Sequence, residues 1–311
     1  MMTHVLVTGA TGFVGSHVTR ALLNRGYEVT GLVRDPAKAS SLAEHGATLA
    51  RGDMLNPCSY QPLVAKVDAV VHTAQYAVGA RLGRRGVRAI EAADDLMTTT
   101  LAGECQRLGR RFVYTSGCFN YGDHGEDWIG PGTPFAPSPL GRGHVRQILA
   151  LRERHGQGLD LVVISPGFVY GPGGLFVSAF CDQLDKGRLR VIGSGRNWWS
   201  FVHVEDLAAA YVAAIDRAAP GTEVEAGDGS PIRLRDMVDL LTDALGRKRV
   251  GTVPPAVIGL LIGAPLAASL ATSFRIRADQ ALGALGWQPV HASFAEGLPP
   301  TLAALGRSAG G

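Results

Sequence analysis

The sequence predicts an α/β fold with a doubly wound parallel sheet, and three observations support this prediction. Short apolar segments alternate with segments of helical periodicity through the first half of the chain. The short segments are rich in β-branched residues and apolar on both faces, as in a parallel sheet that helices cover on both sides. The chain has 311 residues, of which 46% are hydrophobic and 18% charged, as expected of a globular protein with a large core.

The predicted elements follow this alternation in order. Strands are expected at residues 4–8, 28–33, 48–51, 69–73, 112–115 and 161–165. Helices are expected between them at residues 13–25, 37–45, 88–108 and 143–154. After residue 166 the alternation loosens, with loops expected at 171–174 and 193–197 and helices at 204–218 and 234–245. Repeated strand–helix–strand units place their strands parallel in one sheet.

The first strand leads into a glycine-rich turn. Gly9, Gly12 and Gly15 give the pattern G-x-x-G-x-x-G between a predicted strand and a predicted helix. In a dinucleotide-binding turn, the first glycine allows the tight bend, the second lets the backbone approach the pyrophosphate, and the third lets the helix pack closely. The pyrophosphate is then expected at free N–H groups of the helix that starts near Phe13. The alternative is a tight turn that binds no nucleotide.

These signals divide the chain into two regions. Residues 1–166, completed by about 200–227, are expected to form a Rossmann-type nucleotide-binding domain. Residues 167–199 and 228–311 are expected to form a smaller, mostly helical substrate-binding or lid region. A ligand cleft should lie between the two regions, at the carboxyl ends of the strands.

The end of the second strand indicates which dinucleotide binds. NAD sites place an acidic residue there, whereas this chain has Val33, then Arg34, with Lys38 one helical turn later. Basic residues at this point suit a 2′-phosphate, so we predict NADP(H). Asp35 is the counter-argument, because its carboxylate could accept a hydrogen bond from a ribose hydroxyl. Arg34 could also be an ordinary surface residue.

Composition disfavours several other classes of protein. The net charge of +3 is too small to indicate a nucleic-acid partner. The four cysteines show no metal or redox spacing, and free thiols in a cytoplasmic protein are expected. No signal peptide is expected, because a strand is predicted from His4. The apolar stretch 253–274 is interrupted by glycine and proline, so one or two buried or lid helices are expected there rather than a membrane span.

Five segments of the sequence resemble the extended short-chain dehydrogenase/reductase family, the NAD-dependent epimerase/dehydratase group. They are TGATGFVG at 8–15, RFVYTSGCFNYG at 111–122, SPGFVYGPG at 165–173, FVHVEDLAAA at 201–210 and LGWQP at 285–289. In the third segment Ser165 replaces an arginine of the family pattern. The segments span nearly the whole chain, and together they are specific for the family but not for a substrate.

The resemblance implies a set of cofactor-binding residues. Those implied at the pyrophosphate are Gly9, Thr11, Gly12, Phe13, Val14 and Gly15. Those implied near the adenine are Asp53 and Met54, and Ala74 is counted with the cofactor site. Asp53 could instead cap the turn before Pro57. Those implied at the nicotinamide are Pro166, Phe168 and Val169. His203 and Asp206 fall in a family segment whose role is mainly structural.

The family's catalytic residues are missing from the matching positions. The family places a serine or threonine after the fifth strand, where this chain has Gly117, with Ser116 one position earlier. The family's Y-x-x-x-K motif aligns with LGRGH, so Leu140 replaces the tyrosine and His144 the lysine. We count these four residues with the expected substrate site.

No shift of the alignment restores the motif. No tyrosine occurs in residues 122–169, and no lysine occurs in residues 67–185. In this respect the chain is similar to the simocyclinone-type angucyclinone ketoreductases. A positioned general acid is worth about 10²–10⁴-fold in rate, so its loss slows a hydride transfer without preventing it.

Three protein groups and one substrate group are candidates for the missing proton donor. His144 is the first, although a polar residue at a helix start is the simpler interpretation. Ser116 could bond an oxyanion or the backbone, and Tyr121 belongs to a segment expected to pack locally. A substrate with a phenol beside its ketone would polarise the carbonyl and supply the proton itself. We therefore assign no catalytic side chain.

Adjacent tryptophans give the best indication of ligand size. Trp198 and Trp199 could wall a flat aromatic ligand, or one ring could anchor the core while the other is exposed. Together these features predict a cytoplasmic NADPH-dependent ketoreductase of a bulky, aromatic polyketide-type secondary metabolite, as in antibiotic biosynthesis. The alternatives are a non-enzymatic NADP-binding sensor and a nucleotide-sugar epimerase or dehydratase. The last is disfavoured because its reaction needs an efficient base.

Overall fold

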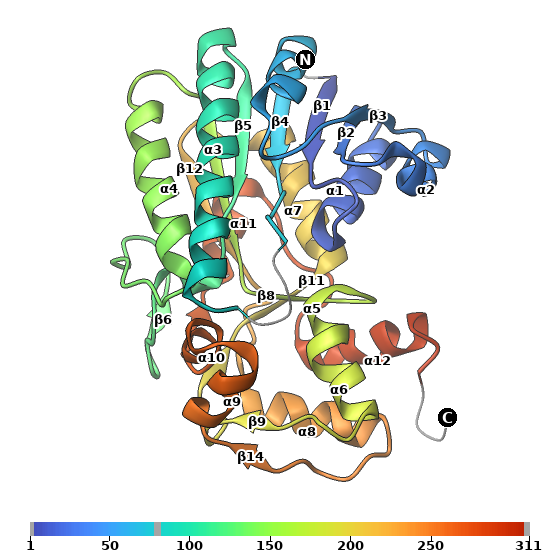
Figure 1. Cartoon of the computed structure of the whole chain (residues 1–311), viewed down its shortest axis with the longest axis vertical. Helices are drawn as coiled ribbons and strands as arrows, with labels where there is room; N and C mark the ends of the chain where they lie inside the picture. Colours follow the sequence, from blue (N-terminus) through green and yellow to red (C-terminus); the bar gives the residue numbers. More distant parts are fainter. Residues whose placement is uncertain (1–2, 78–81, 308–311) are drawn as a thin grey trace.

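A computed structural model describes residues 3–77 and 82–307 of the chain (Figure 1). Seven parallel strands form one sheet in the order β12-β7-β5-β4-β1-β2-β3. They are β1 His4–Thr8, β2 Glu28–Val33, β3 Thr48–Arg51, β4 Ala69–His72, β5 Arg111–Thr115, β7 Leu161–Pro166 and β12 Thr222–Ala226. The predicted doubly wound α/β fold is confirmed.

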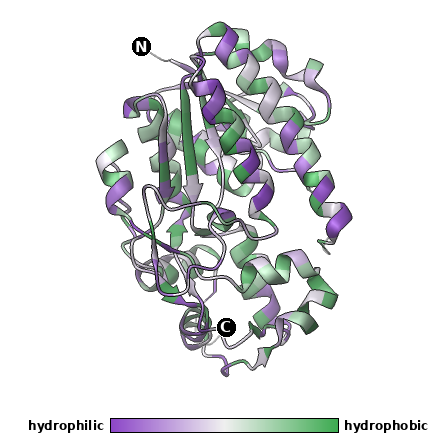
Figure 2. Ribbon diagram, turned by 90° about the vertical axis from the view of Figure 1, so that its left-hand side faces the viewer, coloured by the Kyte–Doolittle hydropathy of each residue, from purple (hydrophilic) through white to green (hydrophobic). Residues whose placement is uncertain are grey.

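Helices cover both faces of this sheet. Those packed on one face are α1 Phe13–Asn24, α2 Ser40–Glu44, α7 Val204–Arg217 and α11 Asp279–Leu285, and those on the other are α3 Arg84–Leu108 and α4 Gly141–His155. Alternate residues of β1 enter the two cores: Val5 and Val7 lie under α1 and α7, whereas Leu6 lies under α3. Figure 2 shows these strands largely in the hydrophobic colour, between helices of mixed character.

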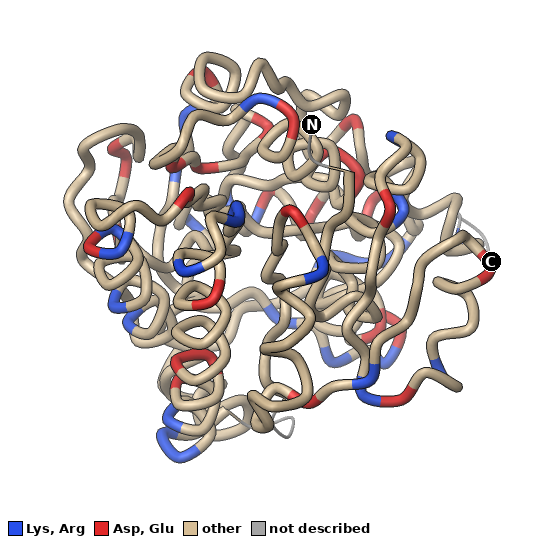
Figure 3. The backbone as a smooth tube through the Cα atoms, turned by 90° about the horizontal axis from the view of Figure 1, so that it is seen from above, with Lys and Arg blue, Asp and Glu red and all other residues tan. Residues whose placement is uncertain are grey.

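Short 3₁₀ segments complete the nucleotide-binding region. They are the 3₁₀ turns Pro36–Ala39, Pro57–Ser59, Gln61–Lys66 and Cys118–Asn120. The predicted helix 37–45 is therefore divided into a 3₁₀ turn and the short α2. Charges of both signs are intermingled over the view in Figure 3, which agrees with the small net charge of +3.

The lower region in Figure 1 is assembled from short pieces of chain. Its two-stranded ladders are β8 Phe168–Tyr170 with β11 Phe201–His203, β9 Val191–Ile192 with β14 Thr252–Val253, β10 Trp198–Trp199 with β13 Ile232–Arg233, and β6 Trp128–Ile129 with β15 Arg275–Ile276. Its helices are α5 Gly174–Phe176, a π-helical turn Val177–Cys181, α6 Asp182–Asp185, α8 Leu234–Ala244, α9 Pro255–Ile262, α10 Ala264–Leu270 and α12 Phe294–Ala304. Every strand of the large sheet falls in residues 1–166 or 200–227, but that the two regions are separate domains stays a prediction.

The apolar stretch 253–274 forms the two short helices α9 and α10, which meet at Gly263. Gly263 has a φ of 101°, and a Cβ there would collide with the Leu82 carbonyl oxygen, so this junction requires glycine. Leu260 and Leu261 of α9 are each 70% exposed. Among residues 3–77 and 82–307, no helix has both the length and the apolar character needed to cross a membrane.

Strand β12 was not predicted, because its sequence TEVEA contains two glutamates. Both glutamates have specific partners at this edge of the sheet. Glu223 accepts a hydrogen bond of 2.6 Å from the Arg152 guanidinium, and the buried Glu225 accepts one from the Tyr121 hydroxyl. Burial raises the pKa of the Glu225 carboxyl above its usual range. These hydrogen bonds therefore stabilise two carboxyl groups that the sequence pattern alone would place on the solvent-exposed surface.

Asp206 connects α7 to the chain that follows α11. Its carboxylate accepts hydrogen bonds from the backbone N–H groups of Val290 (2.9 Å) and His291 (3.0 Å), and from the His291 ring (2.8 Å). The indole N–H of Trp287 donates to the Asp206 carbonyl oxygen at 2.9 Å. Because N–H donors occupy both carboxylate oxygens, this arrangement has the structural role that the family resemblance implies for Asp206.

An aromatic core fills the lower region. Trp199 is 1% exposed and stacks on Phe168 and on Phe274, with ring centroids 5.0 and 5.6 Å apart. Trp198 is only half-buried, and the Arg233 guanidinium lies 4.6 Å from its ring centre. The structure therefore agrees with the alternative in which one tryptophan ring, that of Trp199, anchors the core. Trp199 cannot form the wall of an open cleft.

Replacing Trp199 with alanine should destabilise the fold strongly. Removing a fully buried ring of this size costs about 3–5 kcal/mol. The midpoint of urea unfolding should fall while its slope stays unchanged. Leu261→Ala on the exposed face of α9 is the control, with an expected change below about 0.5 kcal/mol. Similar small changes in both variants would show that the aromatic core contributes little to stability.

Candidate functional site

The glycine turn brings β1, β4 and α1 very close together. Gly9 has a φ of 68°, and a Cβ there would lie 2.7 Å from the Cα of Ala74. The Gly12 N–H donates to the Gly9 carbonyl oxygen at 2.8 Å, which closes the turn. A Cβ at Gly15 would collide with that same oxygen and lie 2.7 Å from the Thr73 hydroxyl. The turn therefore needs glycine at Gly9 and Gly15, for the steric reasons that the sequence motif predicts.

A cavity of about 420 Å³ opens over this turn. The predicted cofactor residues that line it are Gly9, Thr11, Gly12, Phe13, Val14, Gly15, Arg34, Asp53, Met54 and Ala74. Residues that the sequence analysis did not single out also line it, among them Thr73, Gln75, Tyr76, Met97, Gly174 and Leu175. Gly12 precedes the first turn of α1 without a capping side chain, so the amide groups of that turn can bind an anion. These features fit a dinucleotide.

A second hollow of about 380 Å³ adjoins the cavity at the end of β2. It is lined by Thr11, Val33, Arg34, Asp35 and Lys38. One Asp35 oxygen accepts a hydrogen bond from the Ala37 N–H at 3.2 Å, and the other lies 3.6 Å from the Lys38 ammonium. Among the residues that the structure describes, Arg34 has no carboxylate partner. Arg34 is thus more available to a ligand than Asp35 is.

Asp53 both lines the cavity and caps a turn. One of its carboxylate oxygens accepts a hydrogen bond from the Leu55 N–H at 2.8 Å. Its own N–H donates to the Ser59 hydroxyl at 3.0 Å. The two roles that the sequence left open for Asp53 are therefore compatible in one side chain.

The three residues implied at the nicotinamide do not line this cavity. Pro166 ends β7 and is buried, and Phe168 belongs to the aromatic core through its contact with Trp199. Val169 is half-buried on β8. Their assignment to the nicotinamide stays a prediction, and for Phe168 the observed contacts are those of a core residue.

The positions of the family's catalytic residues lie around the carboxyl end of β5. Gly117 is extended, with a φ of −164°, and a Cβ there would meet no atom within 4 Å. Ser116 is 6% exposed and accepts a hydrogen bond of 2.9 Å from the Asn120 amide. Leu140 precedes α4, where its N–H donates to the Ser269 hydroxyl of α10 at 3.2 Å. Neither Gly117 nor Leu140 supplies an acid.

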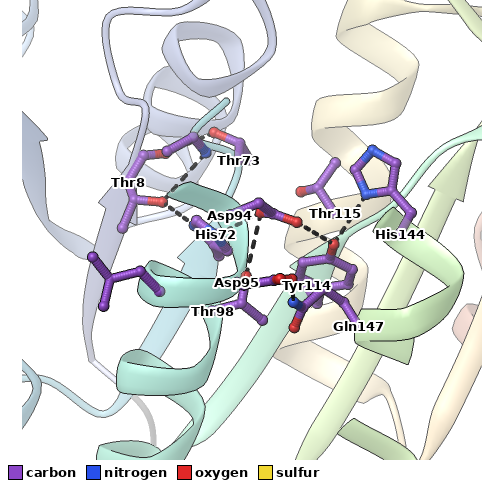
Figure 4. A network of polar contacts seen from close by, with 12 residues as sticks. Thr8, His72, Thr73, Asp94, Asp95, Thr98, Tyr114, Thr115, His144 and Gln147 are labelled. Carbon is purple, nitrogen blue, oxygen red and sulfur yellow. Dashed lines mark hydrogen bonds and ion pairs between the residues drawn. The ribbon is translucent and has the colours of Figure 1, made fainter. Parts of the chain in front are cut away.

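A row of polar side chains crosses the sheet beside these positions (Figure 4). The strand register places Thr8 of β1 opposite His72 of β4, and His72 opposite Tyr114 of β5. The Thr8 hydroxyl lies 2.7 Å from the His72 Nδ1, and the His72 Nε2 lies 3.6 Å from the Asp94 carboxylate of α3. The Tyr114 hydroxyl donates to Asp94 at 3.1 Å.

His144 ends this row from the first turn of α4. Its Nδ1 lies 3.0 Å from the Tyr114 hydroxyl, and burial lowers the pKa of its imidazole. The sequence analysis singled out His144 but missed Tyr114, Asp94 and His72. The signal was available in part, because Thr8, His72 and Tyr114 are polar residues at or near the carboxyl ends of three predicted strands.

The comparison with known proteins identifies the family. A model of the NAD dependent epimerase/dehydratase family matches residues 5–227. The chain belongs to this family. That Gly117, Leu140 and His144 stand at the positions of the family's catalytic residues stays a prediction.

Two relatives are reductases. The chain is 30% identical over 263 residues to a 2-alkyl-3-oxoalkanoate reductase of Stenotrophomonas maltophilia, and the match covers 79% of this chain and 77% of the relative. It is 30% identical over 316 residues to a 3-diazoavenalumate denitrifying reductase of a Streptomyces species, which covers 94% and 98%. The family and these relatives support an oxidoreductase-type enzyme that uses a nicotinamide cofactor.

Solved structures share the fold. The dTDP-glucose 4,6-dehydratase DesIV of Streptomyces venezuelae, solved with NAD, has a TM-score of 0.83 at 24% identity, and the match covers 97% of this chain and 96% of that one. A human epimerase family protein solved with NADPH has a TM-score of 0.81 at 22% identity, covering 97% and 99%. At these identities the likeness establishes the architecture.

Gly15→Ala should destabilise the turn, because the added Cβ has no room between Gly9 and Thr73. Overpacking of this kind costs about 1–3 kcal/mol, measurable by urea unfolding. Gly117→Ser is the matched control, since its side chain enters open space, and its effect should stay within about 0.5 kcal/mol. A Gly15→Ala variant as stable as the control would contradict the close packing described here.

Proposed function

We propose that the protein is an NADPH-dependent ketoreductase that acts on a bulky aromatic ketone of polyketide type. The observation that carries the proposal is a dinucleotide cradle beside a site whose acid positions hold Gly117 and Leu140. NADPH, when bound, supplies the hydride that a ketone carbon accepts. The reductase names of two relatives support reduction over epimerisation, which needs a base that this site does not supply.

The preference for NADP over NAD rests on the end of β2. The Asp35 carboxylate is occupied by Ala37 and Lys38, whereas the Arg34 guanidinium borders both hollows. A guanidinium binds a phosphate through paired charge-assisted hydrogen bonds. Arg34 would therefore hold the 2′-phosphate, and the exposed Lys38, paired with Asp35, would lie beside it.

The protein groups that could protonate the product are engaged elsewhere. The Tyr121 hydroxyl donates to Glu225, and burial raises its pKa far above the usual value. Ser116 is 6% exposed, and its hydroxyl oxygen accepts a hydrogen bond from the Asn120 amide, so burial is what limits its access to a ketone. Burial lowers the pKa of His144, which disfavours the protonated ring that a general acid needs.

The substrate would then supply its own proton. When the carbonyl carbon accepts a hydride, the carbonyl π electrons move onto the oxygen. A phenol O–H already bonded to that oxygen gives it the proton, and water reprotonates the phenolate. The chain's own residues hold the two reactants together, which by itself supplies a large part of the acceleration in such reactions.

Arg34→Ala should weaken NADPH binding much more than NADH binding. The expected loss for NADPH is about 1–3 kcal/mol, the range of a hydrogen bond to a charged group. Fluorescence titration of each cofactor measures the difference. Lys186→Ala is a control basic residue in the lower region, and it should leave both affinities unchanged. Equal losses for NADPH and NADH in Arg34→Ala would remove the assignment of NADP.

A phenol next to the ketone should determine the rate of reduction. Among ketones that bind equally well, one with a neighbouring phenol, such as 8-hydroxy-1-tetralone, should be reduced about 10²–10⁴-fold faster than its O-methyl ether. The measurement is single-turnover NADPH oxidation at saturating ketone, so that binding does not enter. Equal rates would move the proton source to the protein or to water.

A further inference from the structure

The hydrogen bonds around Asp94 have a fixed direction. An ionised carboxylate only accepts, and Asp94 accepts from the hydroxyls of Tyr114 (3.1 Å) and Thr98 (3.3 Å). Burial acts to raise the pKa of Asp94, but the neighbouring His72 and the donated hydrogen bonds outweigh it, so the pKa lies below its usual range. Asp94 is therefore an acceptor at neutral pH.

The direction continues through Tyr114 to His144. A phenol has one proton, and Tyr114, 1% exposed, directs its proton to Asp94. Burial holds the pKa of Tyr114 well above its usual value, so the phenol stays protonated. The Tyr114 oxygen can then only accept from the His144 Nδ1, 3.0 Å away. His144 must carry its proton on Nδ1.

The other ring nitrogen is thereby left as an acceptor. Among the described residues, the His144 Nε2 has no hydrogen-bond partner, and the His144 side chain is half-buried. The charged groups that act on the ring are Asp94, His72 and Glu91, from β4 and α3, and burial outweighs them in keeping the ring neutral. The ring stands at the carboxyl edge of the sheet, where ligands of such folds bind.

We propose that His144 is a specificity-determining acceptor, whose Nε2 binds a hydroxyl group of a bound molecule. The hydroxyl belongs either to the nicotinamide ribose or to the ketone. This inference extends the proposed function. The lysine that the family pattern has at this position would offer three N–H donors and no acceptor, whereas His144 would offer an acceptor. A molecule that presents a carboxylate or phosphate to His144 is disfavoured, because two acceptors would face each other.

The tautomer can be measured without any substrate. Long-range ¹H–¹⁵N spectra at pH 8 should show Nδ1 protonated and Nε2 unprotonated for His144, with His144→Leu providing the assignment among the nine histidines. Tyr114→Phe removes the acceptor at Nδ1 and should shift the population towards the Nε2–H form. A wild-type ring protonated on Nε2 would overturn the proposal.

Binding experiments then distinguish the two sources of hydroxyl. If the ribose is the donor, His144→Leu should raise the Kd of NADPH about 3- to 10-fold, the range of one neutral hydrogen bond. If the ketone is the donor, the Kd of NADPH stays within twofold, and that of 6,8-dihydroxy-1-tetralone, measured with NADP⁺ present, rises instead. The second hydroxyl of this ketone is free to donate, because its 8-hydroxyl already bonds the carbonyl oxygen.

An exposed histidine supplies the control. His45→Leu, at the end of α2, should leave both constants unchanged. Both constants unchanged in His144→Leu would overturn the acceptor role. The spectrum and the NADPH titration do not depend on ketone reduction, so failure of the proposed activity is distinguishable from failure of this inference.

Discussion

A single buried carboxylate fixes the geometry at the carboxyl edge of the sheet. Asp94 of α3 is largely enclosed, and an enclosed ionised group is stable only with good donors around it. Its partners come from different elements: Thr98 from α3, Tyr114 from β5 and, at 3.6 Å, His72 from β4. Asp94 therefore sets how α3 lies across the strands. The same helix carries Met97 to the nucleotide cavity, so cofactor site and sheet edge share one support.

The three positions predicted to replace the family's catalytic residues differ in kind. Gly117 leaves open space, Leu140 is packed through its backbone on α10, and His144 is held by Tyr114. Of the three side chains, only His144 has a polar atom, Nε2, for which the described residues provide no hydrogen-bond partner. Under the proposed function, such a site holds the reactants together but supplies no acid, so the reaction depends on the proton that the substrate contributes.

The sequence predicted the layers of the fold because local pattern decides them. β-branched apolar strands and the glycine turn follow from short-range sterics, and Gly9 and Gly15 lie where those arguments place them. Strand β12 escaped prediction because Glu223 and Glu225 find partners far along the chain in Arg152 and Tyr121. Trp199 likewise depends on Phe168 and Phe274, which only the tertiary structure brings together.

For the candidate site as well, the sequence predicted what local pattern decides and missed what tertiary contacts decide. Of the fourteen residues predicted at the cofactor, ten line one cavity and Lys38 lines the adjoining hollow, whereas Pro166, Phe168 and Val169 line neither. The link from His144 to Tyr114 and Asp94 depends on strand register and on the rotation of α3, which the sequence pattern does not specify. The sequence thus pointed to His144, but not to the hydrogen bonds that connect it to Tyr114 and, through Tyr114, to Asp94.

The pairing of α1 with α7 has a consequence for synthesis of the chain. The core beneath α1 contains Val18 and Leu22, and it is completed by Leu207 and Tyr211 of α7. At about 5–20 residues per second, α7 follows α1 out of the ribosome after an interval on the order of 10–40 seconds. During that interval the nascent amino-terminal half exposes one apolar face of an unfinished sheet. Chaperones that bind exposed apolar segments therefore have a defined period in which to act on this chain.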